Sequence, residues 1–318
     1  MILRLLKMHE IDVDAHAKLI YESRQNSPLR DDERTVEGIK QTLAELQRQE
    51  DTHAMVIAVD EGKGDLLGQL MMWLEWGEIG VASQWQPIVH PSVNQEAVAT
   101  ALIEHAKSLV ETHSKTKLEV WMEISSNQLK SLLPIYEDWY QQCGFKLNSD
   151  EYYMDIEYSK LRELEHSLPE DIEVIPMSKF TNKQLEDVVF ETFRASADEW
   201  VKSMSDPQLN GSVQGWLKRD ETFDPEASIV FKRDGAIIGY NVMRIEGDAI
   251  EVGPVGVFPA YRGKGIGRSL ILESIHRIPE DQYRVWLTVS TGNTSAYNLY
   301  SHLGFENRYT ILIYSWAP

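Results

Sequence analysis

The most informative stretch of this sequence is Val257-Phe258-Pro259-Ala260-Tyr261-Arg262-Gly263-Lys264-Gly265-Ile266-Gly267. It lies between a strand-like apolar run and an apolar-periodic run over 267–278, which predicts a helix. Glycines at such a turn let the backbone approach a ligand and adopt positive φ without a Cβ penalty. The first amides of the helix lack intrahelical partners, and the helix dipole adds positive potential. The turn therefore predicts an anion site suited to a pyrophosphate, to which Arg262 and Lys264 add charge.

Two other phosphate-binding motifs do not fit this turn. A P-loop has Ser or Thr directly after its Gly-Lys pair, where this chain has Gly265. The dinucleotide fingerprint Gly-x-Gly-x-x-Gly follows the first strand of a βαβ unit. Here the third glycine comes one residue too early, and three successive strands are predicted before the turn, over 228–232, 236–245 and 249–258. Both motifs are therefore excluded.

The remainder of the second half has a regular pattern around this turn. Apolar periodicity predicts helices over 183–195, 267–278 and 294–302, and β-rich runs predict further strands over 284–290 and 309–316. Three antiparallel strands followed by strand, helix, strand, helix and strand indicate a mixed, mostly antiparallel sheet flanked by helices. The predicted fold class is therefore α+β.

The first half repeats the landmarks of the second. Tyr140-Gln141-Gln142-Cys143-Gly144-Phe145 matches Tyr300-Ser301-His302-Leu303-Gly304-Phe305, and Val89-His90-Pro91 matches Val257-Phe258-Pro259. The order and spacing agree to within a few residues, which indicates a duplicated domain. A polar, charged stretch containing Pro169 separates the two copies. We predict domains over 1–160 and 170–318, with the junction near 159–170.

Composition limits the compartment and the partners. The 318 residues carry a formal net charge of −19, which argues against a nucleic-acid partner. No stretch approaches the roughly 20 apolar residues of a membrane span, and the N-terminus does not resemble a signal peptide. The single cysteine, Cys143, excludes an internal disulfide framework and a cysteine-based zinc cluster. We expect a cytoplasmic protein with no metal site and no membrane partner.

The glycine turn resembles the acetyl-CoA motif of the GCN5-related N-acetyltransferase (GNAT) superfamily, written Arg/Gln-x-x-Gly-x-Gly/Ala. The second marker of that family is an Asn after the next strand, with Ala, Leu-Tyr and Leu-Gly-Phe following. This sequence has Asn293, Ala296, Leu299-Tyr300 and Leu303-Gly304-Phe305 in the same order. The resemblance covers nearly all of the second half. It implies two tandem GNAT-like domains, as in the mycothiol synthases of this superfamily, which resemble the chain in length and in having one degenerate copy.

The resemblance implies a role for each matching residue. The backbone amides of the turn would hold the CoA pyrophosphate; they belong to Arg262, Gly263, Lys264, Gly265, Ile266, Gly267 and Arg268. Val255 and Val257 would bind the pantetheine arm, and an amide of their strand would polarise the acetyl carbonyl. Pro254 in this strand donates no ladder bond, so we expect the sheet to splay beside it. Asn293 either binds pantetheine or caps the next helix. Tyr300 is either the acid that protonates the leaving thiolate or an aromatic packing residue.

The sequence pattern does not single out one residue as the general base. Glu251 lies on the cofactor strand, where several members of the family have a carboxylate, and is the base we predict. Three other carboxylates are alternatives, those of Glu246, Asp198 and Glu199. The latter two lie near the first helix of the second half, which usually faces the substrate in this family.

The first copy departs from the motif. Aligning Val89 with Val257 places Asn94 at Arg262 and Ala97 at Gly265, while Gln95 and Glu96 replace Gly263 and Lys264. A carboxylate would then face the pyrophosphate, so we expect this half to bind acetyl-CoA poorly and to act as a degenerate domain.

The predicted function is acetyl-CoA-dependent N-acetyl transfer to a primary amine of a small molecule or peptide, by direct attack on the thioester. The alternative is a non-catalytic acyl-CoA-binding or regulatory module. An intact Tyr300 and a complete glycine turn favour the enzyme.

Overall fold

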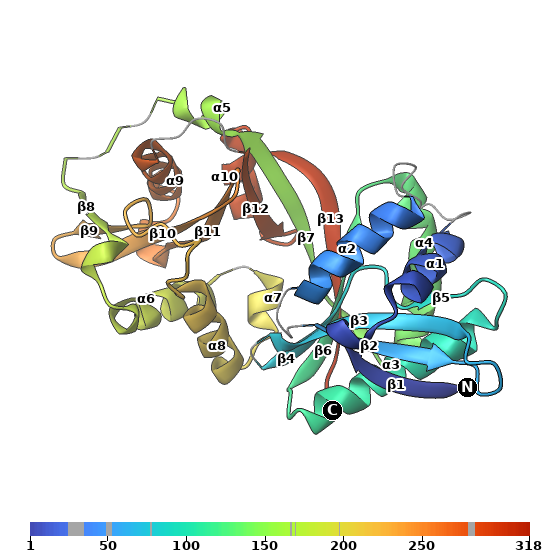
Figure 1. Ribbon diagram of the computed structural model, residues 1–318. Coiled ribbons are helices and arrows are strands. Elements are labelled where there is room, and N and C mark those ends of the chain that lie inside the picture. The colour runs from blue at the N-terminus through green and yellow to red at the C-terminus, as the bar shows by residue number, and fades with distance from the viewer. Residues whose placement is uncertain are drawn as a thin grey trace. The chain divides into compact units, whose positions relative to one another are not determined.

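The computed structural model describes residues 1–24, 35–48, 53–76, 78–165, 167–168, 170–196, 198–278 and 284–318. Contacts divide the chain into two compact units (Figure 1). The first unit comprises Met1–Asn148 and Ile311–Pro318, and the second comprises Ser149–Thr310. In the described residues, no helix is long and apolar enough to cross a membrane.

The first unit is a sheet with helices on both faces. Its sheet has the order β1-β2-β3-β4-β6, antiparallel except for the parallel β4–β6 pair, and β5 pairs with β3. The strands are β1 (Ile2–Lys7), β2 (His53–Val59), β3 (Leu66–Trp76), β4 (Ile79–Ala82), β5 (Ile88–Val89) and β6 (Lys117–Ile124). The helices are η1 (Met8–Glu10), α1 (Val13–Arg24), α2 (Val36–Arg48), α3 (Gln95–Thr112) and α4 (Asn127–Gln142).

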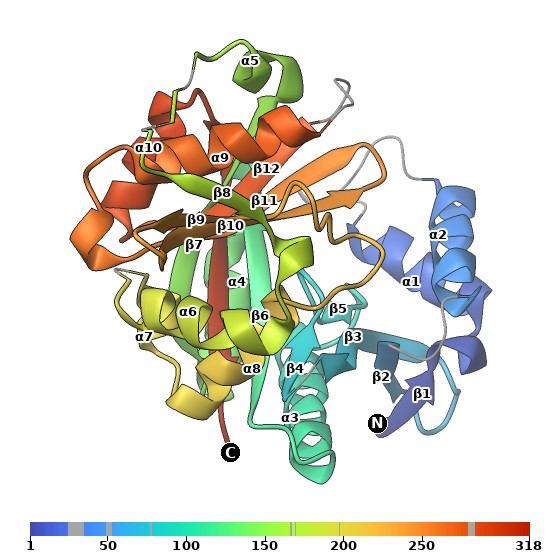
Figure 2. The ribbon, with the colours of Figure 1, turned by 90° about the vertical axis from the view of Figure 1, so that its left-hand side faces the viewer.

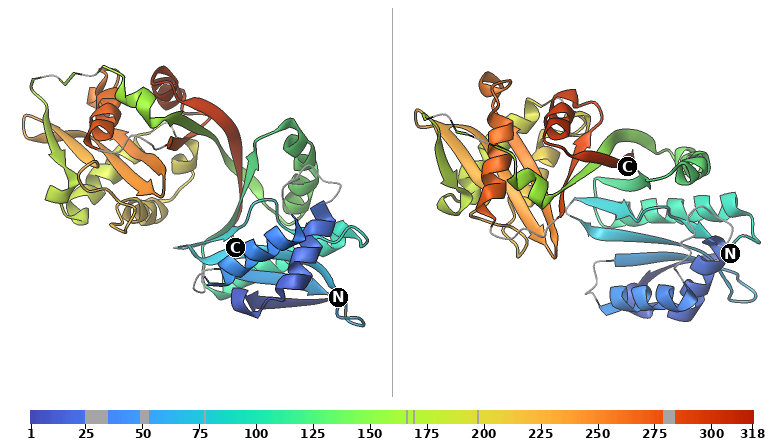
Figure 3. Two further views of the ribbon diagram at one scale, coloured as in Figure 1. Left: turned by 45° about the horizontal axis from the view of Figure 1, so that its top comes forward. Right: turned by 90° about the horizontal axis from the view of Figure 1, so that it is seen from above.

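Alternation along β2 explains why both faces of this sheet are covered. Val56 and Ala58 pack in a cluster with residues of α3 and α4, whereas Met55 and Ile57 pack with residues of α1 and α2. The right-hand view of Figure 3 shows the teal α3 on one side of these strands and the blue α1 and α2 on the other. The strand is therefore apolar on both faces and reads as a continuous hydrophobic run.

The second unit has the same layered plan. Its sheet has the order β7-β12-β11-β10-β9-β8, and its helices lie on both faces. The strands are β7 (Lys146–Glu157), β8 (Glu173–Pro176), β9 (Ile229–Arg233), β10 (Ala236–Glu246), β11 (Ala249–Val257) and β12 (Arg284–Ser290). The last strand of the chain, β13 (Glu306–Trp316), has residues 306–310 in this unit and 311–316 in the first. The helices are α5 (Tyr158–Arg162), η2 (Met177–Lys179), α6 (Asn182–Arg194), α7 (Glu199–Lys202), α8 (Asp206–Trp216), η3 (Pro259–Tyr261), α9 (Ile266–Arg277) and α10 (Thr294–His302).

The two faces of β10 show where the helices of this unit pack. Tyr240 and Val242 lie in a cluster with residues of α6 and α8, whereas Ile238 packs with Ile266 and Leu270 of α9. Figure 2 shows α6 and α8 below these strands and α9 and α10 above them. The α+β class and the flanked mixed sheet predicted from the sequence are confirmed.

Most of the last strand of each half belongs to the unit built mainly from the other half. Residues 151–157 of β7 pair antiparallel with β12, from Glu151↔Ser290 to Glu157↔Arg284, inside the second unit. Conversely, Tyr314 near the C-terminus is buried in the core cluster of the first unit. This division differs from the predicted ranges 1–160 and 170–318, because residue alternation identifies a strand but does not identify its partner.

Candidate functional site

The sheet of the second unit opens beside β11. Parallel pairing between β11 and β12 joins Ala249 to Arg284, Ile250 to Val285 and Glu251 to Trp286. Beyond Glu251 the register has no further pairs, although β11 continues to Val257. Pro254 lies in this unpaired stretch and has no N–H to donate. The predicted splay is therefore present, and beyond Glu251 it leaves one edge of β11 without a strand partner in the described part of the chain.

The amides of Val255 and Val257 point toward this open edge. Phe258 donates its N–H to Ile238 O of β10 at 3.0 Å, so the backbone groups of residue 258 face β10. Successive residues of a strand direct their N–H groups to opposite edges. The N–H groups of Val255 and Val257 consequently face away from β10, as donors for an extended ligand would.

The glycine turn forms an uncapped helix start next to this edge. Gly263 has φ 71° and Gly265 has φ 78°, and Gly265 is the N-cap of α9 with no side-chain cap bond. A Cβ at either glycine would have no atom of the described residues within 4 Å, so among these residues the space above the turn is open. Ile266 is 3% exposed and anchors the first turn of α9 in the core. The Arg262 amide already donates to Pro259 O at 3.3 Å, so the amides left for an anion are those that follow it at the helix start.

Gly267 favours close packing of α9 against α10. A Cβ at this position would lie 3.1 Å from Leu299 Cδ2 of α10, which is tighter than ordinary contact. Of the last two glycines of the motif, Gly265 therefore sets the backbone conformation and Gly267 lets α10 approach.

The basic side chains of the turn donate to backbone carbonyls. Lys264 Nζ lies 2.9 Å from Ala260 O, and Arg268 Nη2 lies 2.8 Å from Glu165 O. Arg262 donates to Val257 O, Ala195 O and Thr192 O. Their positive charges still raise the electrostatic potential at the turn. Their hydrogen bonds go to backbone carbonyls of the protein, so these donors are not directed into the open space above the turn.

Tyr300 lies on α10, and Asn293 directly precedes this helix. The side chain of Asn293 is the N-cap of the helix, because its Oδ1 accepts from Ala296 N at 3.3 Å. The cap uses the amide oxygen, so the predicted contact with pantetheine stays a prediction and falls to the amide nitrogen of Asn293. Tyr300 is 8% exposed and shares a hydrophobic cluster with Val255 of the open strand. Burial, with a contribution from the charge of Asp198, raises the pKa of Tyr300 to about 12.

Glu251 is the last residue of β11 that pairs with β12. Burial raises the pKa of its carboxyl above the usual range, the charge of Glu246 adds to the rise, and Arg244 opposes it. Arg244 is the cross-strand partner of Glu251 on β10. A half-buried carboxylate with a raised pKa at the mouth of the strand gap has the properties of a general base.

The alternative bases differ in their surroundings. Asp198 Oδ1 accepts from Val201 N at 3.1 Å and so caps α7. Glu246 is exposed at the end of β10, and the side chain of Glu199 lies outside the described residues. Glu251, by contrast, lies where β11 separates from β12, and burial raises the pKa of its carboxyl.

Sequence reasoning missed a close contact between β11 and a side chain of β10. A Cβ at Gly256 would lie 2.4 Å from the ring of Tyr240, so only glycine fits beneath that ring. The Tyr240 hydroxyl in turn lies 2.7 Å from Thr192 Oγ1 of α6. A glycine inside a strand often marks such a close approach, and this signal was available in the sequence.

The corresponding region of the first unit is closed by its own side chains. Asn94 caps α3 by accepting from Ala97 N at 3.2 Å. Asn94 therefore corresponds to Gly265, and the expected alignment of Ala97 with Gly265 is wrong. The segment from Val89 to the N-cap of α3 is shorter than the segment from Val257 to the N-cap of α9, and it lacks the glycines.

The comparison with known families identifies the class of the second unit. Residues 189–305 match the family model of the GNAT acetyltransferases. This segment contains the open strand, the glycine turn and α10, and it therefore forms a GNAT-family domain, as the glycine-turn resemblance predicted.

Two relatives with similar sequences are both mycothiol acetyltransferases. The chain is 32% identical to the mycothiol acetyltransferase of Thermomonospora curvata over 143 residues, or 41% of this chain and 48% of that protein. It is 25% identical to the mycothiol acetyltransferase of Sanguibacter keddieii over 272 residues, 80% of this chain and 78% of that protein. The matched segment thus spans about half the length of the first of these relatives.

A solved structure supports the tandem arrangement of the fold. The tandem GNAT protein from the clavulanic acid biosynthesis pathway aligns with 99% of this chain and 98% of its own, with a TM-score of 0.56 and 16% identity. At this identity the likeness shows the fold alone.

Proposed function

We propose that this protein is an acetyl-CoA-dependent N-acetyltransferase that transfers acetyl to a primary amine of a small molecule or peptide by direct attack. The observation that carries the proposal is the adjacency of two sets of unpaired backbone donors. One set lies at the uncapped start of α9, and the other lies along the edge of β11 that β12 leaves open.

These donors fit the two parts of CoA. The amides after Gly263 and Gly265 suit the doubly charged pyrophosphate, because the helix start has positive potential and the space above the glycines is open. The N–H groups of Val255 and Val257 suit the extended pantetheine arm, which would occupy the place of a missing strand. We assign Asn293 to the same arm through its amide nitrogen.

When bound, acetyl-CoA supplies an activated acetyl thioester. Glu251 would accept the proton of the acceptor ammonium, directly or through water, since its raised pKa brings it closer to neutral pH. A backbone N–H of β11 would donate to the thioester carbonyl. Tyr300, protonated because its pKa is about 12, would donate its proton to the leaving sulfur.

The similarity to mycothiol acetyltransferases supports an acetyl-CoA donor. The acceptor is left open, because the acceptor contacts of a GNAT domain lie in variable segments such as 195–216. An acidic chain favours a cationic amine over a nucleic acid.

A thiol-release assay against a panel of primary amines tests the proposal. We expect amine-dependent CoA release by the wild type, with retention of acetyl-CoA binding but about 100-fold slower release in Tyr300→Phe. Saturable acetyl-CoA binding without amine-dependent release across the panel would instead favour the non-catalytic binding module.

A further inference from the structure

The Arg262 side chain joins β11, the cofactor strand, to α6. This helix precedes the variable residues 195–216, which we call the acceptor segment. The Nε of Arg262 donates to Val257 O at 2.8 Å, its Nη1 to Ala195 O at 2.9 Å and its Nη2 to Thr192 O at 3.3 Å. Val257 is the last residue of β11, whereas Thr192 and Ala195 lie at the C-terminal end of α6. One guanidinium therefore bonds to both elements.

The guanidinium is well suited to this position. The last carbonyls of a helix have no intrahelical partner and carry the negative end of the helix dipole. Arginine offers five donors in a rigid plane, so a single side chain can satisfy carbonyls from two directions. A lysine ammonium at the same position would lack that planar geometry.

A second contact ties the same end of α6 to the sheet. Thr192 Oγ1 lies 2.7 Å from the hydroxyl of Tyr240 on β10, and the ring of Tyr240 covers Gly256 of β11. The end of α6 is thus attached to the cofactor strand through two independent routes. A change at the glycine turn would reach α6 through Arg262, while Tyr240 keeps the helix in place.

The residues after α6 include Asp198, whose charge acts on the proposed acid Tyr300. Asp198 caps the short helix α7, and Trp200 of α7 lies 6.2 Å from Trp216 of α8, ring centre to ring centre. The charge of Asp198 also contributes to the raised pKa of Tyr300. The order of this segment therefore bears on the acceptor side and on the proposed acid.

We propose that Arg262 is a positioning residue that couples acetyl-CoA binding at the glycine turn to the order of the C-terminal end of α6 and the acceptor segment after it. The inference rests on the proposed function. A pyrophosphate held by the turn amides fixes the backbone of residue 262, and the side chain of that residue then holds the carbonyls of α6. In this role the guanidinium stays on the carbonyls and does not bind phosphate.

Hydrogen–deuterium exchange and calorimetry with acetyl-CoA test this coupling without knowledge of the acceptor. In the wild type, acetyl-CoA should slow exchange in peptides covering 188–196 by about tenfold. In Arg262→Met the Kd for acetyl-CoA should change by less than about threefold, while this ligand-dependent protection is lost. Arg262→Lys should recover part of the protection. Arg233→Met removes an exposed ion pair with Asp171 in the same unit and should keep all of it.

Two results would overturn the assignment. A Kd at least about 30-fold weaker in Arg262→Met, with protection intact at saturating acetyl-CoA, would show that the guanidinium binds phosphate. Unchanged exchange over 188–196 when acetyl-CoA binds to the wild type would show that no coupling exists. The Lys variant decides the matter if the Met variant does not fold. Absence of any acetyl-CoA binding by the wild type would contradict the proposed function itself, which calorimetry reports separately.

Discussion

The two units begin equivalent helices in opposite ways. In the first unit α3 starts at an Asn94 side chain that bonds to the free amide of Ala97, whereas in the second unit α9 starts at Gly265 with no side-chain cap. A capped start stabilises the helix by about 1 kcal/mol and consumes the amide that an anion would use. An uncapped glycine start gives up that stability and keeps the amides available. The start of the equivalent helix is thus closed to an anion in the first unit and open to one in the second.

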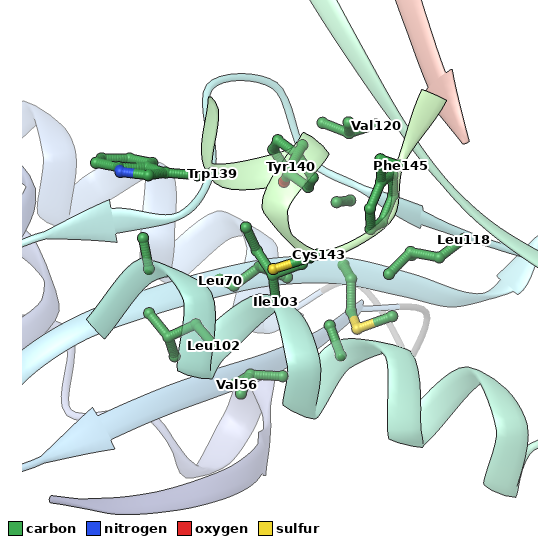
Figure 4. Close-up of a cluster of buried hydrophobic side chains, with 14 of the residues drawn as sticks. Val56, Leu70, Leu102, Ile103, Leu118, Val120, Trp139, Tyr140, Cys143 and Phe145 are labelled. Carbon is green, nitrogen blue, oxygen red and sulfur yellow. The ribbon is translucent and has the colours of Figure 1, made fainter. Parts of the chain in front are cut away.

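The paired tyrosines make the same distinction. Tyr140 is fully buried and donates its hydroxyl to Gln86 O at 3.0 Å, and Figure 4 shows it among the apolar side chains of the first core. Tyr300 occupies the matching place before Phe305 and is slightly exposed at 8%. We infer that Tyr140 has a structural role and that Tyr300 has a chemical one.

The largest effect is expected at Gly265. Gly265→Val should weaken acetyl-CoA binding by about 1000-fold, because a β-branched residue resists positive φ and the turn amides would leave their positions. Calorimetric titration measures the change. Gly64→Val is the matched control, since Gly64 has φ 76° and open space around its Cβ position in the first unit. Equal loss of binding in both variants would contradict the assignment of the site to the second unit.

The tyrosine pair should separate catalysis from stability. Tyr300→Phe should lower kcat by about 100-fold with little change in Kd for acetyl-CoA, because only proton donation is removed. Tyr140→Phe should keep kcat and lower the free energy of unfolding by about 1 kcal/mol, through its lost hydrogen bond. Since the pKa of Tyr300 is about 12, kcat should not fall through ionisation of this tyrosine below pH 10. Normal turnover by Tyr300→Phe would remove it from the mechanism.

Glu251 should produce a smaller loss with a diagnostic pH dependence. Glu251→Gln should lower kcat/KM by about 30-fold, because water can replace part of the base. The pKa of Glu251 is raised, so wild-type kcat/KM should rise as pH increases through that pKa and then level off. That rise should vanish in the Gln variant.

The same carboxyl also has a predicted effect on stability. Because its folded pKa lies above its unfolded pKa, its stabilising contribution is present at low pH and is lost as pH rises through the folded pKa. Glu251→Gln should therefore unfold at a slightly higher urea concentration than the wild type at pH 7. A lower midpoint would mean that the ionised carboxyl is stabilised in the fold.

The smallest effect is expected from removing the cap of the closed helix. Asn94→Ala should lower the free energy of unfolding of the first unit by about 1 kcal/mol and should not create a second acetyl-CoA site. The turn before α3 would still lack the glycines. Denaturant unfolding and calorimetry measure the two quantities, and a gain of a second binding event would contradict the account.

Local sequence patterns predicted the parts of the site that depend on local chemistry. Gly263 and Gly265 indicated positive φ, and Pro254 indicated the splay of β11, because each follows from the backbone of one residue. The partners of Arg262 on α6 could not be predicted, because they are about 70 residues away in the chain. The exchange of β7 and β13 was missed for the same reason, since strand alternation carries no information on pairing.

The most direct test of the central claim is the stoichiometry of acetyl-CoA binding to the wild type and to Ala97→Glu, which places a carboxylate at an exposed position in the first turn of α3. We predict one molecule bound per chain, with the same affinity in both proteins. Two molecules per chain, or loss of binding in Ala97→Glu, would contradict the assignment of the open site to the second unit.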